Sequence, residues 1–213
     1  MIETSYFPIF PTNVLGFRVD SCEELNKEIS TYILKQKEVE SCNDDRSVIG
    51  GWHSKNNLIE LEYSWSKDLR DLIMAVVDDY INKLDTYIKQ SGGVTLKERI
   101  NGVKLESWGI VLNSGNISSY HTHPGSFLSG VYYVKVPQEM QSNSTGKFNI
   151  PDFRSGPMAT MDWFSENFKF IPAEGMGLVF PSWIPHYVDP HFEDEERISI
   201  SWNVQFDFKA LNN

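Results

Sequence analysis

Apolar residues in the first hundred positions recur with the period of an α-helix in two places. The stripe through Ile29 and Ile33 predicts a first helix over residues 21–40. Ser21 and Glu24 have the spacing of a capping box, which predicts where this helix begins.

A second helix is predicted from about Ser66 to the glycine pair at 92 and 93, because glycine favours a helix end. Its apolar face consists of Leu69, Leu72, Ile73, Val76, Tyr80, Leu84 and Ile88. A helix of more than about 20 residues with such a face needs a partner surface, since helices gain most of their stability by packing.

The remaining N-terminal stretches lack helical periodicity. Residues 5–19 are apolar and contain two prolines, which predicts an edge strand or an extended lead-in. Residues 41–57 are polar and contain glycine, so we expect a loop there.

After residue 100 the pattern changes to short strands separated by glycine, proline, asparagine and aspartate. The predicted strands are 104–112, 117–122, 127–136, 146–150, 168–171, 176–181, 186–189 and 197–208. Strands of this number and length indicate a mainly β, double-sheet jelly roll, with the two helices packed on one sheet. We expect a single domain over 1–213, with a lead-in and helical buttress over 1–100 and the core over 101–208.

The last predicted strand has one apolar and one polar face. Ile198, Ile200, Trp202, Val204 and Phe206 alternate with Arg197, Ser199, Ser201, Asn203 and Gln205. The polar face could meet solvent, as in a half-exposed strand, or it could line the interior of the barrel. The two predicted amphipathic helices need a sheet face to pack against, and this favours the second interpretation.

Composition excludes several classes of protein. A net charge of −10 argues against nucleic acid or an anionic membrane as the main partner. Cys22 and Cys42 are too few for a disulfide framework and favour a reduced cytoplasm. No signal peptide is evident, and no apolar run reaches the roughly 20 residues that span a bilayer. A homodimer stays open.

Three of the five histidines indicate a metal site. In an extended strand His121 and His123 project from the same face, with Cα atoms about 6.5–7 Å apart. Two such imidazoles can chelate one ion, and His186, in a largely apolar segment, can supply a third. Imidazole suits iron, zinc, copper and nickel, so these side chains alone do not name the metal. We expect His191, in a charged loop, to be solvated.

Arg197 and Ser199 also share a face. Together they offer a guanidinium fork and a hydroxyl to a carboxylate. The alternative is a surface arginine that pairs with Glu193, Glu195 or Glu196, which contributes little.

These segments resemble the Fe(II)/2-oxoglutarate-dependent oxygenases, in particular a branch with three signatures. H-x-H-P-x-S-x-x-S-G-V-Y-Y is matched over 121–133, F-P-S-W-x-x-H-x-V over 180–188, and E-R-I-S-I-S-x-N over 196–203. The resemblance covers roughly 104–206, and the segment 50–54 is similar as well. It implies that Fe(II), 2-oxoglutarate and O2 serve to hydroxylate an unidentified prime substrate, with release of succinate and CO2.

The resemblance also implies roles for individual residues. Arg197 would bind the distal carboxylate of 2-oxoglutarate, with Ser199 beside it. Tyr133, favoured over its neighbour, and Asn113 would shape the cosubstrate pocket.

The chain departs from the family pattern at one ligand position. The usual triad has two histidines and a carboxylate, and His123 stands where that carboxylate is expected. We favour three histidine ligands, namely His121, His123 and His186. The alternative is that Asp152 or water fills the third place.

Two other functions stay open at this point. A cupin-like dioxygenase could use three histidines without 2-oxoglutarate. A non-catalytic jelly-roll binding module would hold no metal at all.

Overall fold

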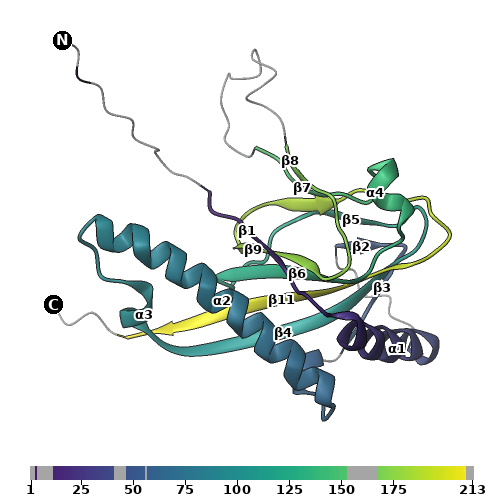
Figure 1. Cartoon of the computed structure of the whole chain (residues 1–213), viewed down its shortest axis with the longest axis horizontal. Coiled ribbons are helices and arrows are strands. Elements are labelled where there is room, and N and C mark those ends of the chain that lie inside the picture. The colour runs from purple at the N-terminus through teal and green to yellow at the C-terminus, as the bar shows by residue number, and fades with distance from the viewer. Residues whose placement is uncertain (1–2, 4–11, 41–46, 56, 153–166, 210–213) are drawn as a thin grey trace.

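Two antiparallel sheets and two long helices form the computed structural model, which describes residues 3, 12–40, 47–55, 57–152 and 167–209 (Figure 1). The larger sheet has the order β1-β9-β6-β11-β4-β3, and the smaller has the order β2-β5-β10-β7-β8. The expected mainly β double-sheet fold is therefore confirmed.

The described strands agree closely with the predicted ones after residue 100. The strands are β1 Leu15–Arg18, β2 Val48–Ile49, β3 Trp52–His53, β4 Ile100–Leu112, β5 Ile117–His121, β6 Leu128–Lys135, β7 Phe148–Ile150, β8 Phe168–Phe170, β9 Met176–Pro181, β10 His186–Val188 and β11 Arg197–Phe208. β1 pairs only with β9, so this part of the lead-in is an edge strand as expected. Residues 5–11 of the predicted lead-in lie outside the described residues.

The helices lie mainly before the strands in the chain. They are α1 Glu23–Val39, η1 Leu58–Glu60, α2 Ser64–Gln90, α3 Leu96–Arg99 and, between β6 and β7, α4 Glu139–Asn143. α2 ends where the sequence predicts, because Gly92 follows with a φ of +72°.

The predicted capping box at Ser21 is wrong. Ser21 has a φ of +54°, and the helix begins two residues later after Cys22, which makes no side-chain cap. A capping box does form at α3, where Thr95 and Glu98 satisfy each other's backbone N–H groups.

The predicted loop over 41–57 is partly wrong. β2 adds to β5 in the smaller sheet, and β3 adds to β4 in the larger sheet. Each strand has two residues, which is too short for a period of two to appear in the sequence. Residues 41–46 and 56 lie outside the described residues.

The helices cover the outer face of the larger sheet, as Figure 1 shows for α1 and α2. Ile29 and Ile33 from α1 and Leu69 and Ile73 from α2 are fully buried in the same cluster as Trp202 from β11. A second cluster lies on the inner side, between the sheets, and includes Leu112, Tyr133, Phe148, Phe180 and Ile184. The apolar face of β11 therefore meets the helices, and its polar face points between the sheets.

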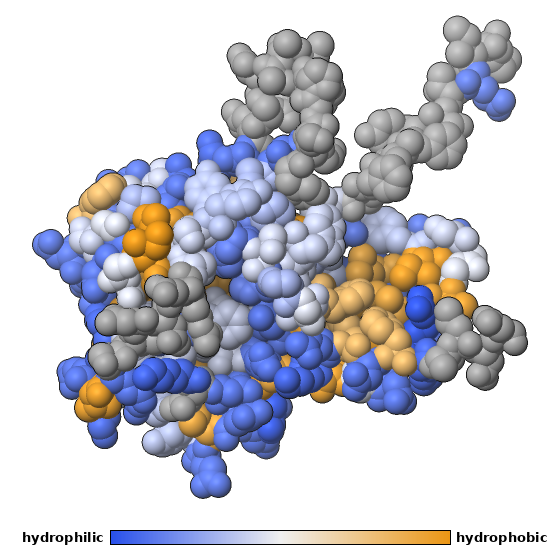
Figure 2. All heavy atoms as spheres, turned by 180° about the vertical axis from the view of Figure 1, so that it is seen from behind, coloured by the Kyte–Doolittle hydropathy of each residue, from blue (hydrophilic) through white to orange (hydrophobic). Residues whose placement is uncertain are grey.

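Within the described part of the chain, no helix is both long and apolar enough to cross a membrane. The surface seen from behind the view of Figure 1 is mostly hydrophilic, with one larger hydrophobic group and smaller separate ones (Figure 2).

Candidate metal centre and cosubstrate pocket

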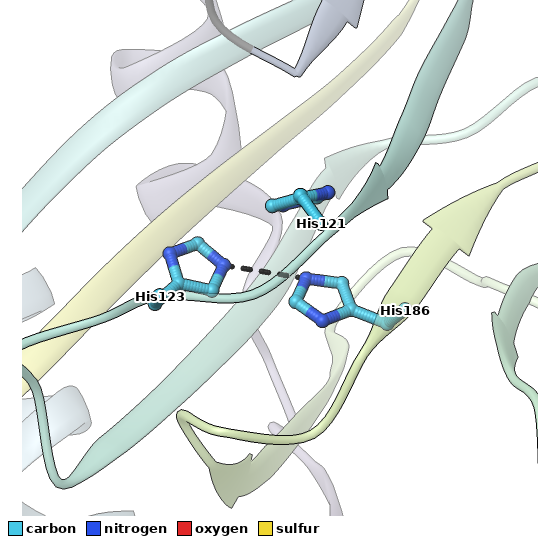
Figure 3. A group of neighbouring side chains, drawn as sticks. All are labelled: His121, His123 and His186. Carbon is cyan, nitrogen blue, oxygen red and sulfur yellow. Dashed lines mark hydrogen bonds between the residues drawn. The ribbon is translucent and has the colours of Figure 1, made fainter. Parts of the chain in front are cut away.

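Three imidazoles converge between the sheets, where β5 ends and β10 begins (Figure 3). His121 ends β5 and lies opposite His186, the first residue of β10, in the antiparallel register. His123 follows two residues after β5, where its N–H donates to the Ser182 carbonyl at 2.9 Å. One nitrogen from each of the three rings lies within 4.8 Å of the other two.

Backbone carbonyls hold two of these rings in one tautomer. Nδ1 of His121 is 2.6 Å from the Ser119 carbonyl, and Nδ1 of His186 is 3.0 Å from the Ile184 carbonyl. A carbonyl can only accept, so each Nδ1 carries the proton and each Nε2 keeps its lone pair. The lone pair of His186 Nε2 accepts from His123 Nε2 at 3.3 Å (Figure 3). Metal-binding histidines have this arrangement, in which the other ring nitrogen donates to a fixed acceptor.

Burial keeps the three rings neutral. It lowers the pKa of His121, and together with the nearby imidazoles it lowers the pKa of His123 to about 4 and that of His186 to about 3. Phe148 stacks on the His186 ring at 5.1 Å between centroids, and Phe180 meets it edge-on at 4.8 Å. Near neutral pH the cluster therefore presents unprotonated imidazoles, as metal ligation requires.

A cavity of about 490 Å³ connects these histidines to the polar face of β11. Its wall includes Arg197, Ser199, Ser201 and Asn203 from that strand. The interpretation that this face lines the barrel interior is therefore confirmed. Arg197 and Ser199 lie in the same cavity as the three histidines.

Arg197 is buried, with 3% of its surface exposed. Its Nη1 donates to the Gly146 carbonyl at 3.0 Å, and its guanidinium lies 5.6 Å from the centre of the Tyr133 ring. Its Nε is buried and has no hydrogen-bond partner among the described residues. The alternative that Arg197 is a surface residue in an ion pair is therefore wrong. Glu195 and Glu196 instead approach Lys135.

Tyr133 leaves a second buried donor unpaired beside this guanidinium. Its hydroxyl makes no hydrogen bond to the described residues, and burial raises its pKa to about 12, so it keeps its proton. Buried polar groups are normally paired, so two unpaired donors on cavity-lining residues are suited to an anionic ligand. A dicarboxylate fits this donor set.

Two residues considered from the sequence lie elsewhere. Asn113 is exposed in the turn after β4, where its side chain accepts from Lys37 at 3.3 Å, and it does not line the cavity. Asp152 is exposed, and no carboxylate belongs to the histidine cluster among the described residues.

Sequence reasoning missed one contributor to the cavity wall, His53, and misjudged His191. His53 from β3 and Trp108 from β4 stack at 5.6 Å and line the cavity beside His123. The segment that resembles the family contains His53, but nothing local marks its side chain as a cavity residue. His191, expected in solvent, is fully buried, because its Nε2 bonds the Leu112 carbonyl and its Nδ1 lies 3.3 Å from Glu193.

Comparison with known families agrees with this site. Residues 106–203 match the family model described as "Putative 2OG-Fe(II) oxygenase". Over this segment, which contains the three histidines and Arg197, the chain is similar to the 2OG-Fe(II) oxygenases. It is therefore an oxygenase that depends on Fe(II) and 2-oxoglutarate and uses O2, and its substrate is unidentified. No curated protein sequence matches the chain.

Solved structures share the fold of this oxygenase at low sequence identity. A Pseudomonas putida prolyl-4-hydroxylase has a TM-score of 0.61 at 15% identity, over 93% of this chain and 94% of its own. A Trichoplax adhaerens prolyl hydroxylase in complex with a hypoxia-inducible factor peptide has a TM-score of 0.58 at 16% identity, over 90% and 83%. HygX from Streptomyces hygroscopicus, with nickel and 2-oxoglutarate bound, has a TM-score of 0.59 at 10% identity, over 91% and 83%.

Proposed function

We propose that His121, His123 and His186 hold the catalytic Fe(II) of this oxygenase. Their convergence, the unprotonated Nε2 atoms of His121 and His186, and the depressed pKa values support a three-imidazole site. Ferrous iron, when bound, would couple the activation of O2 to the conversion of 2-oxoglutarate into succinate and CO2. The overall reaction oxidises a C–H bond of the substrate to an alcohol. The protein's part is to orient both reactants and to exclude water.

We assign the distal carboxylate of 2-oxoglutarate to Arg197, Ser199 and Tyr133. The single observation that carries this assignment is the buried Nε of Arg197, which has no partner among the described residues and belongs to a side chain that lines the same cavity as the histidines. A carboxylate there would satisfy the guanidinium and the Tyr133 hydroxyl together. Asn113 is left out, since it does not line the cavity.

The strand register separates the two ends of the cavity. Along β11 and β4, Arg197 pairs with Leu112, Ser199 with Ile110, Ser201 with Trp108, and Asn203 with Glu106. Four residues along a strand span about 13 Å, so the Trp108 end lies well away from Arg197. We assign the prime substrate to the Trp108 end, where the stacked His53 ring extends the aromatic wall beside His123.

Three further expectations remain part of this proposal. We treat 1–213 as one domain, with 1–100 as lead-in and buttress and 101–208 as the catalytic core, because α1 and α2 share a hydrophobic cluster with β11. A cytoplasmic location rests on cysteine usage alone. A homodimer is open.

One experiment separates this function from a three-histidine dioxygenase that does not use 2-oxoglutarate. The untagged protein is loaded with Mn(II) under anaerobic conditions and titrated with 2-oxoglutarate. The matched ligand is 2-oxopentanoate, which has the same chain and chelating end but a methyl group in place of the distal carboxylate. We expect 2-oxoglutarate to bind far more tightly. Equal binding of the two ligands, or no binding of either, would overturn the carboxylate assignment.

A further inference from the structure

His191 occupies a fully buried position in an otherwise charged loop. Its Nε2 is 2.9 Å from the Leu112 carbonyl and therefore donates to it, and its Nδ1 is 3.3 Å from a carboxylate oxygen of Glu193. The bond to Leu112 holds the ring against β4, whereas Nδ1 makes no hydrogen bond to a described residue and attracts the Glu193 carboxylate only when both ring nitrogens are protonated. Nothing in the proposed chemistry uses it.

Glu193 ties this loop to the turn after α4. Its carboxylate accepts from Thr145 Oγ1 at 3.0 Å, from Asn143 Nδ2 at 3.2 Å, and from the backbone N–H of Phe192 at 3.0 Å. These contacts fix the turn that immediately precedes Gly146. They also lower the pKa of Glu193 although burial acts to raise it, so the carboxylate is charged near neutral pH.

The loop contacts β4 at Leu112 and the backbone at Gly146, and both of these positions are direct neighbours of Arg197. Leu112 is the Cα partner of Arg197 in the β4–β11 register. The Gly146 carbonyl accepts from Arg197 Nη1, and the Gly146 N–H donates to the Pro190 carbonyl at 3.0 Å. Gly146 has a φ of +59°, and a Cβ there would approach the Cβ of His191 to 3.4 Å, so this backbone packs directly on the histidine.

We infer that His191 and Glu193 are positioning residues that aim the Arg197 guanidinium at the distal carboxylate of the cosubstrate. The inference rests on the proposed role of Arg197. An arginine side chain has several rotatable bonds, and fixing them in advance removes an entropic cost from ligand binding. In the structure one carbonyl, that of Gly146, fixes Nη1 while Nε stays unpaired beside the cavity. The bonds from Glu193 to the preceding turn and the packing of His191 against Gly146 hold that carbonyl in place.

The test uses His191→Gln, Glu193→Gln and the double variant, each loaded with Mn(II) and titrated anaerobically with 2-oxoglutarate and with 2-oxopentanoate. We expect each single variant to bind 2-oxoglutarate about tenfold more weakly, which corresponds to the net value of about one hydrogen bond. The double variant should lose little more than either single one, because the two residues act as a unit. Binding of Mn(II) and of 2-oxopentanoate should stay unchanged.

Loss of affinity for both oxo acids, or for Mn(II), would mean general damage to the fold and would overturn the inference. If the His191 and Glu193 variants fold poorly, Thr145→Val keeps the inference testable. This substitution removes one hydrogen bond to Glu193 and changes the side-chain volume little. It should give a smaller, two- to threefold loss for 2-oxoglutarate alone, and wild-type affinity would count against the inference.

Two control variants separate this inference from the proposed function. Glu195→Gln changes an exposed carboxylate of the same loop and should leave both affinities unchanged. Arg197→Lys should weaken 2-oxoglutarate binding. If it does so while the His191 and Glu193 variants match wild type, the positioning role is wrong and the proposed function stands. If Arg197→Lys also matches wild type, the proposed function itself fails.

Discussion

Tyr132 and Tyr133 are adjacent in β6, and their hydroxyl groups lie on opposite sides of the larger sheet. Tyr132 belongs to the cluster under the helices, and its hydroxyl donates to Asn26 of α1 at 2.7 Å. Tyr133 belongs to the inner cluster, lines the cavity and has an unpaired hydroxyl. The pair divides the sheet into a face that packs under the helices and a face that lines the cavity proposed for the cosubstrate.

This division gives opposite expectations for the two phenylalanine variants. Tyr132→Phe leaves the buried Asn26 oxygen without its donor, so the free energy of unfolding should fall by about 1–3 kcal/mol. Tyr133→Phe removes a hydroxyl that pairs with no described residue, so stability should change by less than about 0.5 kcal/mol. Urea unfolding of the metal-free protein measures both.

Binding should reverse that order. Tyr133→Phe is expected to weaken 2-oxoglutarate binding several-fold in the Mn(II) form, whereas Tyr132→Phe should bind it like the wild type. A large stability loss in Tyr133→Phe with unchanged affinity would assign that hydroxyl to the core instead.

Removal of a ligand imidazole tests the metal assignment. His121→Ala and His186→Ala should fold and lose tight Fe(II) binding, because only two imidazoles remain. Metal content after anaerobic dialysis measures the effect. The control is His53→Ala, which changes another cavity histidine that is not in the cluster and should retain the metal. Stoichiometric iron in either ligand variant would refute the assignment.

His123 distinguishes a three-histidine site from the usual family triad. His123→Asp restores a carboxylate and should still bind Fe(II), whereas His123→Ala should bind it more weakly. Spectroscopy of the wild-type metal site should show three coordinated imidazoles. A signal from only two would remove His123 from the ligand set.

Arg197→Lys replaces a fork of donors with a point charge. Loss of one charge-assisted hydrogen bond costs roughly 1.5–3 kcal/mol, so 2-oxoglutarate should bind about 10–100-fold more weakly. The affinity for Mn(II) and for 2-oxopentanoate should be unaffected. Anaerobic titrations of the variant and of the wild type give the three values.

Acid should destabilise the metal-free protein through the histidine cluster. In the unfolded chain a histidine takes up a proton below about pH 6.5, but in the folded protein His123 does so only near 4 and His186 only near 3. Between these values the unfolded state binds more protons, so stability is complete above about 6.5 and falls as the pH decreases toward 3. Each unit of lowered pKa corresponds to about 1.4 kcal/mol.

Urea midpoints across this pH range measure the slope. His123→Asn should flatten it, because it removes one titrating ring without adding a charge. Excess Mn(II) should protect the wild type at the upper end of the range, since metal binds only the unprotonated ligands. A slope in His123→Asn equal to that of the wild type would show that other groups dominate.

Local sequence was enough to predict the elements that carry the site. The alternation in β11 separates a helix-covered face from a polar one, because side-chain direction in a strand has a period of two whatever the sheet contains. The spacing of His121 and His123 likewise predicts that both can reach one ion, although His123 lies two residues beyond the end of β5. The stripe through Ile29 and Ile33 predicts the helix that covers the sheet, since burial of one face follows from helical period alone.

Contacts between distant segments were decided only by the tertiary structure. The acidic neighbours of His191 in the sequence predict a solvated side chain. The side chain is instead buried, next to the Leu112 carbonyl and Glu193. His53 reaches the cavity through a two-residue strand that pairs with β4. The unpaired donors of Arg197 and Tyr133 became visible only once their neighbours were placed. Burial and hydrogen-bond satisfaction depend on which segments pack together, and local periodicity does not contain that information.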